Sequence, residues 1–271
     1  MFFVVYSWKE VFFFTITNYK ERGNKKIKSK EYNYYKNIAN WSFEEINYIS
    51  ENYTNWIYEE EITKHTNKNS KILDLGTAGG ENLLKYFPDC QEILGTDYSK
   101  EMIDTSNKNL LKSGRKNIKF KVMDNLKMNT PNNYFDLVTA RHTPINPKQI
   151  YKTLKYGGYL IVRGVDKLDC WNLKMLFEKG QSYNEQKPIS LIDYENIVKA
   201  GFKDVELIPI HIIEYYKTKE DLYALLIKTP ILNSMNDEKI DLEKFNNYVK
   251  DNTFEKGIKL IRRYYGIVAK K

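Results

Sequence analysis

Short apolar segments alternate with helical patterns along the middle of this chain. Each apolar segment is rich in Ile, Leu and Val and ends in a turn that carries glycine or acidic residues. The stretches between them carry helix signals: Ser99 as an N-cap, Gly114 as a stop and Asn146-Pro147 as a second start. Strands that alternate with helices in this way predict a parallel sheet covered by helices. The predicted strands are 71–75, 92–97, 118–123, 134–140 and 159–165.

The flanking regions are less regular. Before the core, 41–50 and 53–62 have helical patterns, with Ser42 as a possible N-cap. Their aromatic residues either roof a pocket or pack on the sheet, and the sequence leaves both open. These are Trp41, Phe43, Tyr48, Tyr53, Trp56 and Tyr58. After the core we expect an apolar helical stripe of Leu168, Trp171, Met175 and Leu176, and then a helix from a Ser190 cap to Ala200. A strand at 205–216 and a helix from Thr218 follow. The chain then has a helix inserted within 233–257 and a last strand within 258–269.

The turn after the first strand is the strongest chemical signal. Asp74 lies just before Gly76, and Gly79 and Gly80 precede a predicted helix that begins near Glu81. A strand, a glycine turn and a helix start make a nucleotide-type site. NAD-binding turns carry a further glycine where this chain has Ala78, and that glycine lets the backbone approach a pyrophosphate. S-adenosylmethionine (SAM) has no pyrophosphate, and its ammonium group suits an acid such as Asp74.

Two later strand ends extend this site. Asp97 ends the second strand, and its two carboxylate oxygens match the two hydroxyls of a ribose. Asp124 and Asn125 follow the third strand, where their side chains can meet an adenine edge. These acids favour SAM over NAD or an ordinary strand-to-helix turn.

With these motifs in order from Lys71 to Val165, the chain resembles the class I SAM-dependent methyltransferases, and within them a group of uncharacterised bacterial members. The departures are Ala78, where glycine is common, and Tyr156, where proline is common. The resemblance implies an α/β Rossmann-like three-layer sandwich, whose seven-stranded, mostly parallel sheet has the order 3-2-1-4-5-7-6 with strand 7 antiparallel. It implies SAM as cofactor, with no metal. The implied cofactor-binding residues are Asp74, Gly76, Thr77, Gly80, Asp97, Tyr98, Met102, Asp124, Asn125 and Arg141.

The residues just past the fourth strand face the methyl group in this family. Here they begin with Arg141 and His142. Arg141 can hold an anionic substrate group or the SAM carboxylate, and His142 can act as a base or simply satisfy a local hydrogen bond. The Asn/Asp-Pro-Pro-Tyr signature of many amino-methylating enzymes is absent. We therefore predict Arg141 and His142 as catalytic residues, with the acceptor unidentified.

Composition and length limit the remaining alternatives. The 271 residues fit one domain. We expect 1–30 to be a disordered extension and 31–271 to be the methyltransferase domain, with a helical cap to about 70, a SAM-binding core over 71–165 and a substrate-side half over 166–271. The net charge of +8 comes from scattered lysines in a chain also crowded with Asn, Ile and Tyr. An A/T-rich genome produces such a composition without any selection for RNA binding. Cys90 and Cys170 show no metal-ligand spacing and suit a reducing cytoplasm.

No apolar run approaches the roughly 20 residues of a membrane span, and the apolar segment 1–17 lacks the features of a signal peptide. The sequence therefore predicts a cytoplasmic methyltransferase that acts on a small molecule in preference to RNA. The alternatives are an rRNA or tRNA base methyltransferase, a SAM-binding protein without catalysis and, further off, a nicotinamide dehydrogenase.

Overall fold

The computed structural model describes residues 46–232 and 240–271. Its centre is a single mixed sheet with the order β1-β7-β9-β6-β5-β2-β3-β4, and β8 pairs with β9 alone. The parallel part comprises β2 (Lys71–Leu75), β3 (Glu92–Asp97), β4 (Ile118–Val122), β5 (Phe135–Arg141) and β6 (Leu154–Val165). The remaining strands are β1 (Tyr48–Asn52), β7 (Lys203–Tyr216), β8 (Thr253–Phe254) and β9 (Gly257–Lys270).

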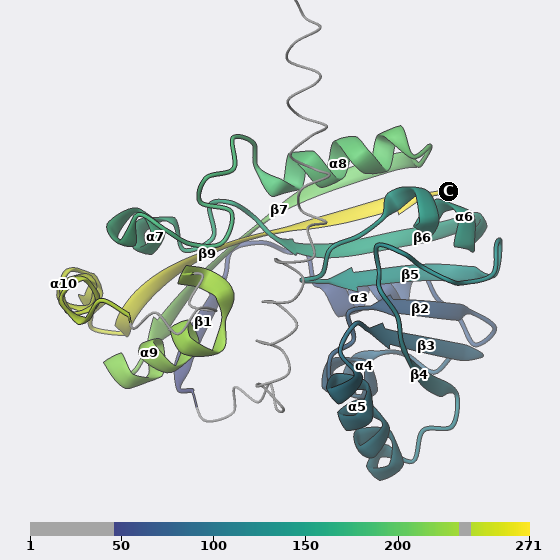
Figure 1. Ribbon diagram of the computed structural model, residues 1–271, viewed down its shortest axis with the longest axis horizontal. Coiled ribbons are helices and arrows are strands. Elements are labelled where there is room, and N and C mark those ends of the chain that lie inside the picture. Colours follow the sequence, from purple (N-terminus) through teal and green to yellow (C-terminus); the bar gives the residue numbers. More distant parts are fainter. Residues whose placement is uncertain (1–45, 233–239) are drawn as a thin grey trace, which may run out of the picture.

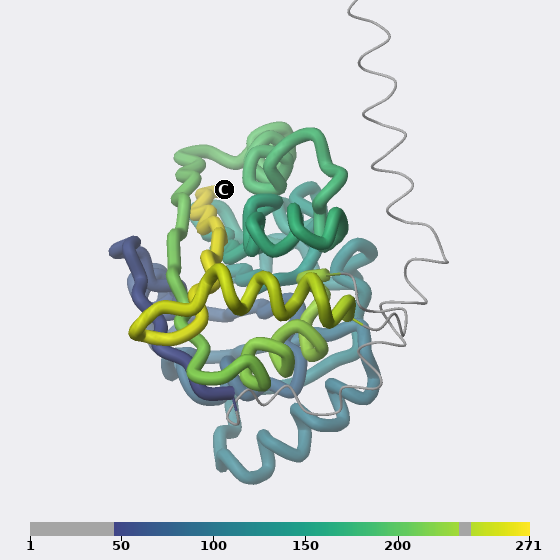
Figure 2. The backbone as a smooth tube through the Cα atoms, turned by 90° about the vertical axis from the view of Figure 1, so that its left-hand side faces the viewer, coloured from purple at the N-terminus to yellow at the C-terminus, as the bar shows by residue number. Residues whose placement is uncertain are grey.

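The predicted strand order is confirmed. Counted from β2 and without β1 and β8, the sheet runs 3-2-1-4-5-7-6, and the strand in seventh place, β9, is antiparallel to both β6 and β7. The sheet has two strands more than the seven we predicted. β1 extends it beyond β7, as Figure 2 shows in purple and green, and β8 forms a short hairpin with β9.

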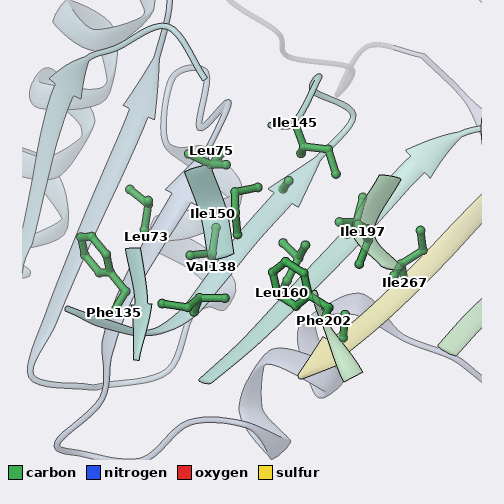
Figure 3. Packing of buried hydrophobic residues seen from close by; sticks show 14 of the residues in the cluster. Leu73, Leu75, Phe135, Val138, Ile145, Ile150, Leu160, Ile197, Phe202 and Ile267 are labelled. Carbon is green, nitrogen blue, oxygen red and sulfur yellow. The ribbon is translucent and has the colours of Figure 1, made fainter. Parts of the chain in front are cut away.

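Helices cover both faces of the sheet (Figure 1). On one face lie α3 (Tyr58–Lys64), α4 (Glu81–Tyr86) and α5 (Lys100–Ser113), packed over Ile72 and Leu137. On the other lie α6 (Pro147–Thr153) and α8 (Ile189–Lys199). Figure 3 shows that second core, in which Leu73, Val138 and Leu160 of alternating strand positions meet Ile150 and Ile197. Alternation along each strand thus sends Leu73 to one layer and leaves Asp74 on the other.

The long strands β7 and β9 continue past the parallel strands toward a separate helical group (Figure 1). That group contains α7 (Trp171–Phe177), α9 (Lys219–Lys228), the 3-10 turn at Pro230–Leu232 and α10 (Leu242–Asn252). Together with the adjoining ends of β7 and β9, this group forms a third apolar core, around Leu173, Leu226 and Leu260. A capping box of Thr218 and Asp221 starts α9, as the sequence indicated for Thr218.

Several local predictions are confirmed and others are wrong. Ser99 caps α5 by accepting from Met102 N–H, Gly114 ends it in the left-handed region, and Asn146 caps α6. The helix predicted over 41–50 is wrong from residue 46 onward, because β1 pairs with β7 there, while Trp41 and Phe43 lie outside the described residues, as does the extension 1–30. The second predicted N-terminal helix starts later than expected, at Tyr58.

Three corrections concern the second half of the chain. β6 begins at Leu154, five residues before the predicted start. The predicted stripe on α7 is wrong, since Leu173 and Phe177 are buried while Met175 is half exposed. Ser190 is not the cap of α8; it lies inside the first turn, where its hydroxyl donates to Asp166.

Candidate functional site

Asp74 is a buried carboxylate at the end of β2, where the strand enters its glycine turn. Its Oδ1 accepts a hydrogen bond of 2.7 Å from Thr139 on the neighbouring strand β5. Burial raises the pKa of Asp74 to about 6, against the lowering effects of Thr139 and the nearby Arg141. The side chain therefore sits close to its titration point near neutral pH and favours a cationic partner.

The turn after Asp74 is held by hydrogen bonds to the neighbouring strand β3 and by one within the turn itself. The N–H groups of Gly76 and Thr77 both donate to the carbonyl of Thr96, and Gly80 N–H donates to the carbonyl of Thr77. Gly76 has φ +73°, and a Cβ there would lie 2.7 Å from the Cβ of Thr143. Glycine is thus required by the backbone conformation and by the approach of Thr143, and recognition of a ligand falls mainly to side chains.

Asp97 joins this turn to the end of β3. Its Oδ2 accepts from Ala78 N–H at 3.0 Å and its Oδ1 from Ser99 N–H at 2.9 Å. Burial raises the pKa of Asp97, while these backbone donors oppose the change. Tyr98 N–H is a third backbone donor to this carboxylate. A carboxylate has about four acceptor positions, so one remains for a ribose hydroxyl.

A third strand end reaches the same turn through Thr143. Asn125, which is buried, donates from Nδ2 to Thr143 Oγ1 at 2.9 Å, and Thr143 in turn packs against Gly76. Asp124 accepts from Leu126 N–H and so shapes the turn after β4. The predicted residues from β2, β3 and β4 are therefore brought together around the Gly76 turn.

Buried polar atoms without a hydrogen-bond partner gather at this place. They are Thr77 Oγ1, near Asp74, the hydroxyl of Tyr58, near Thr139 and Asp74, Asn125 Oδ1 and Arg141 Nε. Within the described residues none of the four has a partner in good hydrogen-bond geometry. Native proteins rarely leave buried polar groups unsatisfied, so such a group calls for an explanation. A polar ligand that supplies both donors and acceptors satisfies these atoms.

Arg141 and Arg163 lie side by side on β5 and β6, in register with one another. Arg163 Nη1 lies 3.1 Å from His142 Nε2. Since a guanidinium can only donate, His142 accepts with Nε2 and is the neutral imidazole with its proton on Nδ1. The surrounding protein, followed by the charges of Arg163, Arg141 and Arg262, holds the pKa of His142 well below its usual range, although the ring keeps access to solvent.

Tyr264 of β9 supports this cationic group from the side. Its ring stacks on His142 and lies 4.5 Å from the guanidinium carbon of Arg163. Arg262, two residues earlier, is paired through Nε and Nη2 with Asp169 and through Nη1 with Glu214. Arg262 is therefore neutralised by carboxylates, whereas no carboxylate within residues 46–232 and 240–271 pairs with Arg163.

Tyr98 and Met102, also predicted as cofactor-binding residues, follow Asp97 in the chain, and the structure adds residues that the sequence did not single out. Tyr98 is about half exposed after β3, and Met102 is buried on α5 with its N–H taken by the Ser99 cap. The sequence did not indicate Arg163 or Tyr264, and it indicated Tyr58 only as one of the aromatic residues that either roof a pocket or pack on the sheet. Only Arg163 carried a signal that could have been used, as a charged residue within an otherwise apolar strand. Tyr58 and Trp56 pack on the sheet, the second over Gly266.

Comparison with known proteins decides the family. A sequence profile described as a methyltransferase domain matches residues 66–228, more than half of the chain. The chain belongs to this family. The family that its motifs resemble, the class I methyltransferases, is thereby confirmed. A curated relative, the uncharacterised methyltransferase YcgJ of Bacillus subtilis (strain 168), is 26% identical over 85 residues, which are 31% of this chain and 34% of the relative.

Solved structures agree on the fold. The crystal structure of YcgJ from Bacillus subtilis superposes with a TM-score of 0.53 at 16% identity, over 78% of this chain and 96% of that one. The crystal structure of a putative methyltransferase from Bacillus halodurans C-125 superposes with a TM-score of 0.51 at 17% identity, over 78% of this chain and 96% of that one. At such identities the likeness concerns the fold alone.

Two further observations apply to residues 46–232 and 240–271 only. None of the helices there combines the length and apolar character needed to cross a bilayer. Nor do three His, Cys, Asp or Glu side chains of that part converge as metal ligands would.

Proposed function

We propose that this protein transfers the methyl group of SAM to a small-molecule acceptor. The observation that carries the proposal is the group of unpartnered buried polar atoms around Asp74. They come from the ends of β2, β4 and β5 and from α3, next to the carboxylate of Asp97. An amino acid joined to a nucleoside has the ammonium, carboxylate, hydroxyl and adenine groups that such a set would hold.

Each end of the cofactor has its own residues in this proposal. Asp74 takes the ammonium group and Arg141 the carboxylate, because they occupy neighbouring strands in electrostatic contact. Thr77, Gly76 and Gly80 shape the turn beneath them. Asp97 accepts a ribose hydroxyl and Asn125, helped by Asp124, meets the adenine edge. Tyr98 and Met102 follow Asp97 and stand next to the adenosine in the family, so we keep them as flanking residues of the site.

Bound SAM supplies an activated methyl group, which leaves sulfur as the acceptor's lone pair bonds to it, so that neutral S-adenosylhomocysteine remains. The protein then has to align the acceptor and exclude water. His142 and Arg141 lie where the acceptor would arrive. His142 is a neutral donor through Nδ1–H as it stands, and it becomes a base only if the acceptor replaces Arg163 at Nε2.

A small molecule is favoured over RNA by where the site's charge lies. Arg141 and Arg163 are partly buried in the site, whereas a nucleic-acid surface presents exposed basic side chains in a stripe or patch. The proposed setting is the cytoplasm, in keeping with the two unpaired cysteines.

Two measurements test the proposal. Calorimetry with S-adenosylhomocysteine and with NAD separates the cofactors, and binding of NAD alone would overturn the assignment. Labelled SAM incubated with separate small-molecule, RNA and protein fractions then reveals the acceptor class. We expect label in the small molecules; label in RNA would favour the base methyltransferase, and binding without any transfer would favour a SAM-binding protein that does not catalyse.

A further inference from the structure

Arg163 carries a charge that neither the described part of the chain nor the cofactor balances. Arg262 next to it is paired with Asp169 and Glu214. Among the described residues no carboxylate forms an ion pair with Arg163 or with Arg141. Glu59 raises the pKa of Arg163 through its charge alone, without forming an ion pair with it. Two adjacent guanidinium groups repel each other, and the lowered pKa of Arg163 reflects burial and that repulsion.

The proposed cofactor increases this excess of positive charge. SAM has two positive groups and one carboxylate. If Arg141 takes the carboxylate and Asp74 the ammonium, then the sulfonium and Arg163 remain as two uncompensated cations in one partly desolvated site. Like charges so placed are costly, and a neutral acceptor would leave them facing each other. An anionic group between them would remove this cost.

The geometry around Arg163 is also that of a held donor. Tyr264 supports one side of the guanidinium at 4.5 Å, and Nη1 is fixed on His142 Nε2. A planar guanidinium has five N–H donors, so this arrangement leaves donors for two oxygens of one anion.

We propose that the methyl acceptor carries a carboxylate or phosphate group and that Arg163 binds this oxyanion. That the bound anion is the methyl acceptor rests on the proposed methyl transfer. The anion site itself can be tested without turnover. Arg163 is a binding and specificity residue in this view, distinct from Arg141, which serves the cofactor.

Binding of simple probes provides the first test. Benzoate and phenyl phosphate share a ring with benzyl alcohol and benzylamine, so the four differ mainly in the charge of the head group. We expect the two anions to bind the full chain, with and without S-adenosylhomocysteine, and Arg163→Gln to weaken them at least about tenfold through loss of charge-assisted hydrogen bonds. Equal binding of benzyl alcohol or benzylamine, or no effect of the substitution, would overturn the proposal.

A matched control and a conservative variant sharpen this test. Arg263 is the neighbour of Arg262 on β9 but faces the opposite way, where its Nη1 donates to a backbone carbonyl. Arg263→Gln removes the same charge and should leave anion binding within twofold. Arg163→Lys keeps the charge but lacks the planar fork of donors, so it should restore the binding of phenyl phosphate more than the binding of benzoate. The affinity for S-adenosylhomocysteine should stay within about threefold in all three variants.

Turnover provides the second test and separates the two sources of the oxyanion. A cell extract is sorted on an anion exchanger before incubation with labelled SAM, and half of the retained fraction is treated with phosphatase. Label in the retained fraction supports the proposal, as a phosphate if phosphatase abolishes acceptance and as a carboxylate if it does not. Label confined to the unretained fraction overturns it. If no fraction accepts label, the methyltransferase proposal fails, while the probe titrations still decide on the anion site.

Discussion

The imidazole of His142 lies nearly parallel to the ring of Tyr264, with 5.3 Å between ring centroids and 12° between the planes. His142 follows β5 and has a positive φ of 54°, and Tyr264 is buried on β9, which is separated from β5 in the sheet by β6. A strained backbone at a residue with catalytic chemistry is often maintained by surrounding contacts. The stack is such a contact, and it fixes the ring that Arg163 addresses.

Tyr264→Leu should therefore impair transfer more than cofactor binding. Loss of the stack and of the guanidinium's aromatic neighbour removes interactions that are each about 1 kcal/mol. We expect methyl transfer to fall about fivefold to thirtyfold, with S-adenosylhomocysteine affinity within threefold by calorimetry. Tyr264→Phe keeps the ring and should retain most activity. Equal activity of the two variants would show that the stack has no role in orienting His142.

The pH dependence of cofactor binding should report on Asp74. Only the ionised carboxylate attracts the ammonium group, and its pKa in the free protein is raised to about 6. The affinity for S-adenosylhomocysteine should rise by up to about tenfold per pH unit below pH 6 and level off above it. Calorimetry between pH 5 and 8 measures this. Asp74→Asn should bind weakly with a flat profile; an unchanged slope in the variant would assign the titration to another group.

The same residue should affect stability with a sign opposite to that of a salt-bridged acid. Between pH about 4 and 6 the folded protein holds a proton on Asp74 that the unfolded chain has lost, so the free energy of unfolding falls as pH rises through this window. A shift of about two pKa units corresponds to about 3 kcal/mol. Urea denaturation at pH 4.5 and 7 of the wild type and of Asp74→Asn measures the difference, which the variant should largely lose.

Asp97 should be the strongest single contributor to adenosine recognition. Asp97→Ala removes the charge-assisted hydrogen bonding to the ribose and also the acceptors of Ala78 and Ser99 N–H, so affinity should fall at least about tenfold. Asp104→Ala is the control, since Asp104 is exposed on α5 and pairs only with Lys100 among the described residues. Titration with S-adenosylhomocysteine compares the two, and similar affinities would refute the ribose role.

Local signals were sufficient for most of the fold. The strands around Asp74, the cap at Ser99 and the stop at Gly114 all depend on short-range chemistry that the sequence displays. The strand order came from the family resemblance, since periodicity does not encode which strands pair. The error at Tyr48 has the same origin: 41–50 has a helical pattern, but pairing with β7, a partner more than 150 residues away, decides its conformation.

The site residues also fall into two groups, those that local sequence signals predict and those that only strand pairing brings together. Asp74, Asp97 and Asn125 follow strand ends, and a parallel sheet brings strand ends together, so their association was predictable from the sequence. Arg163 and Tyr264 lie within strands, and their approach to His142 depends on the pairing of β6 with β5 and β9. No local pattern announces such a contact between residues that distant in the chain. The sequence therefore predicted Arg141 and His142, but not the residues that contact His142 from β6 and β9.

Gly76 and Gly114 form a natural pair for measuring how much the contact with Thr143 matters. Both have positive φ, +73° and +70°, but a Cβ at Gly114 would meet nothing within 4 Å, whereas at Gly76 it would overlap the side chain of Thr143. Gly114→Ala should cost about 1 kcal/mol for the backbone alone, and Gly76→Ala a further 1–3 kcal/mol for overpacking. Urea denaturation measures both.

The double variant Gly76→Ala/Thr143→Gly isolates that further cost. Removing the Cβ of Thr143 relieves the overlap, so the two substitutions should compensate by about 1 kcal/mol or more in a double-mutant cycle. Thr143 also accepts the hydrogen bond of Asn125, and its loss should weaken S-adenosylhomocysteine binding even where stability recovers. Strict additivity of the two substitutions in stability would mean that the turn yields to the added methyl group and that Gly76 is needed for its φ alone.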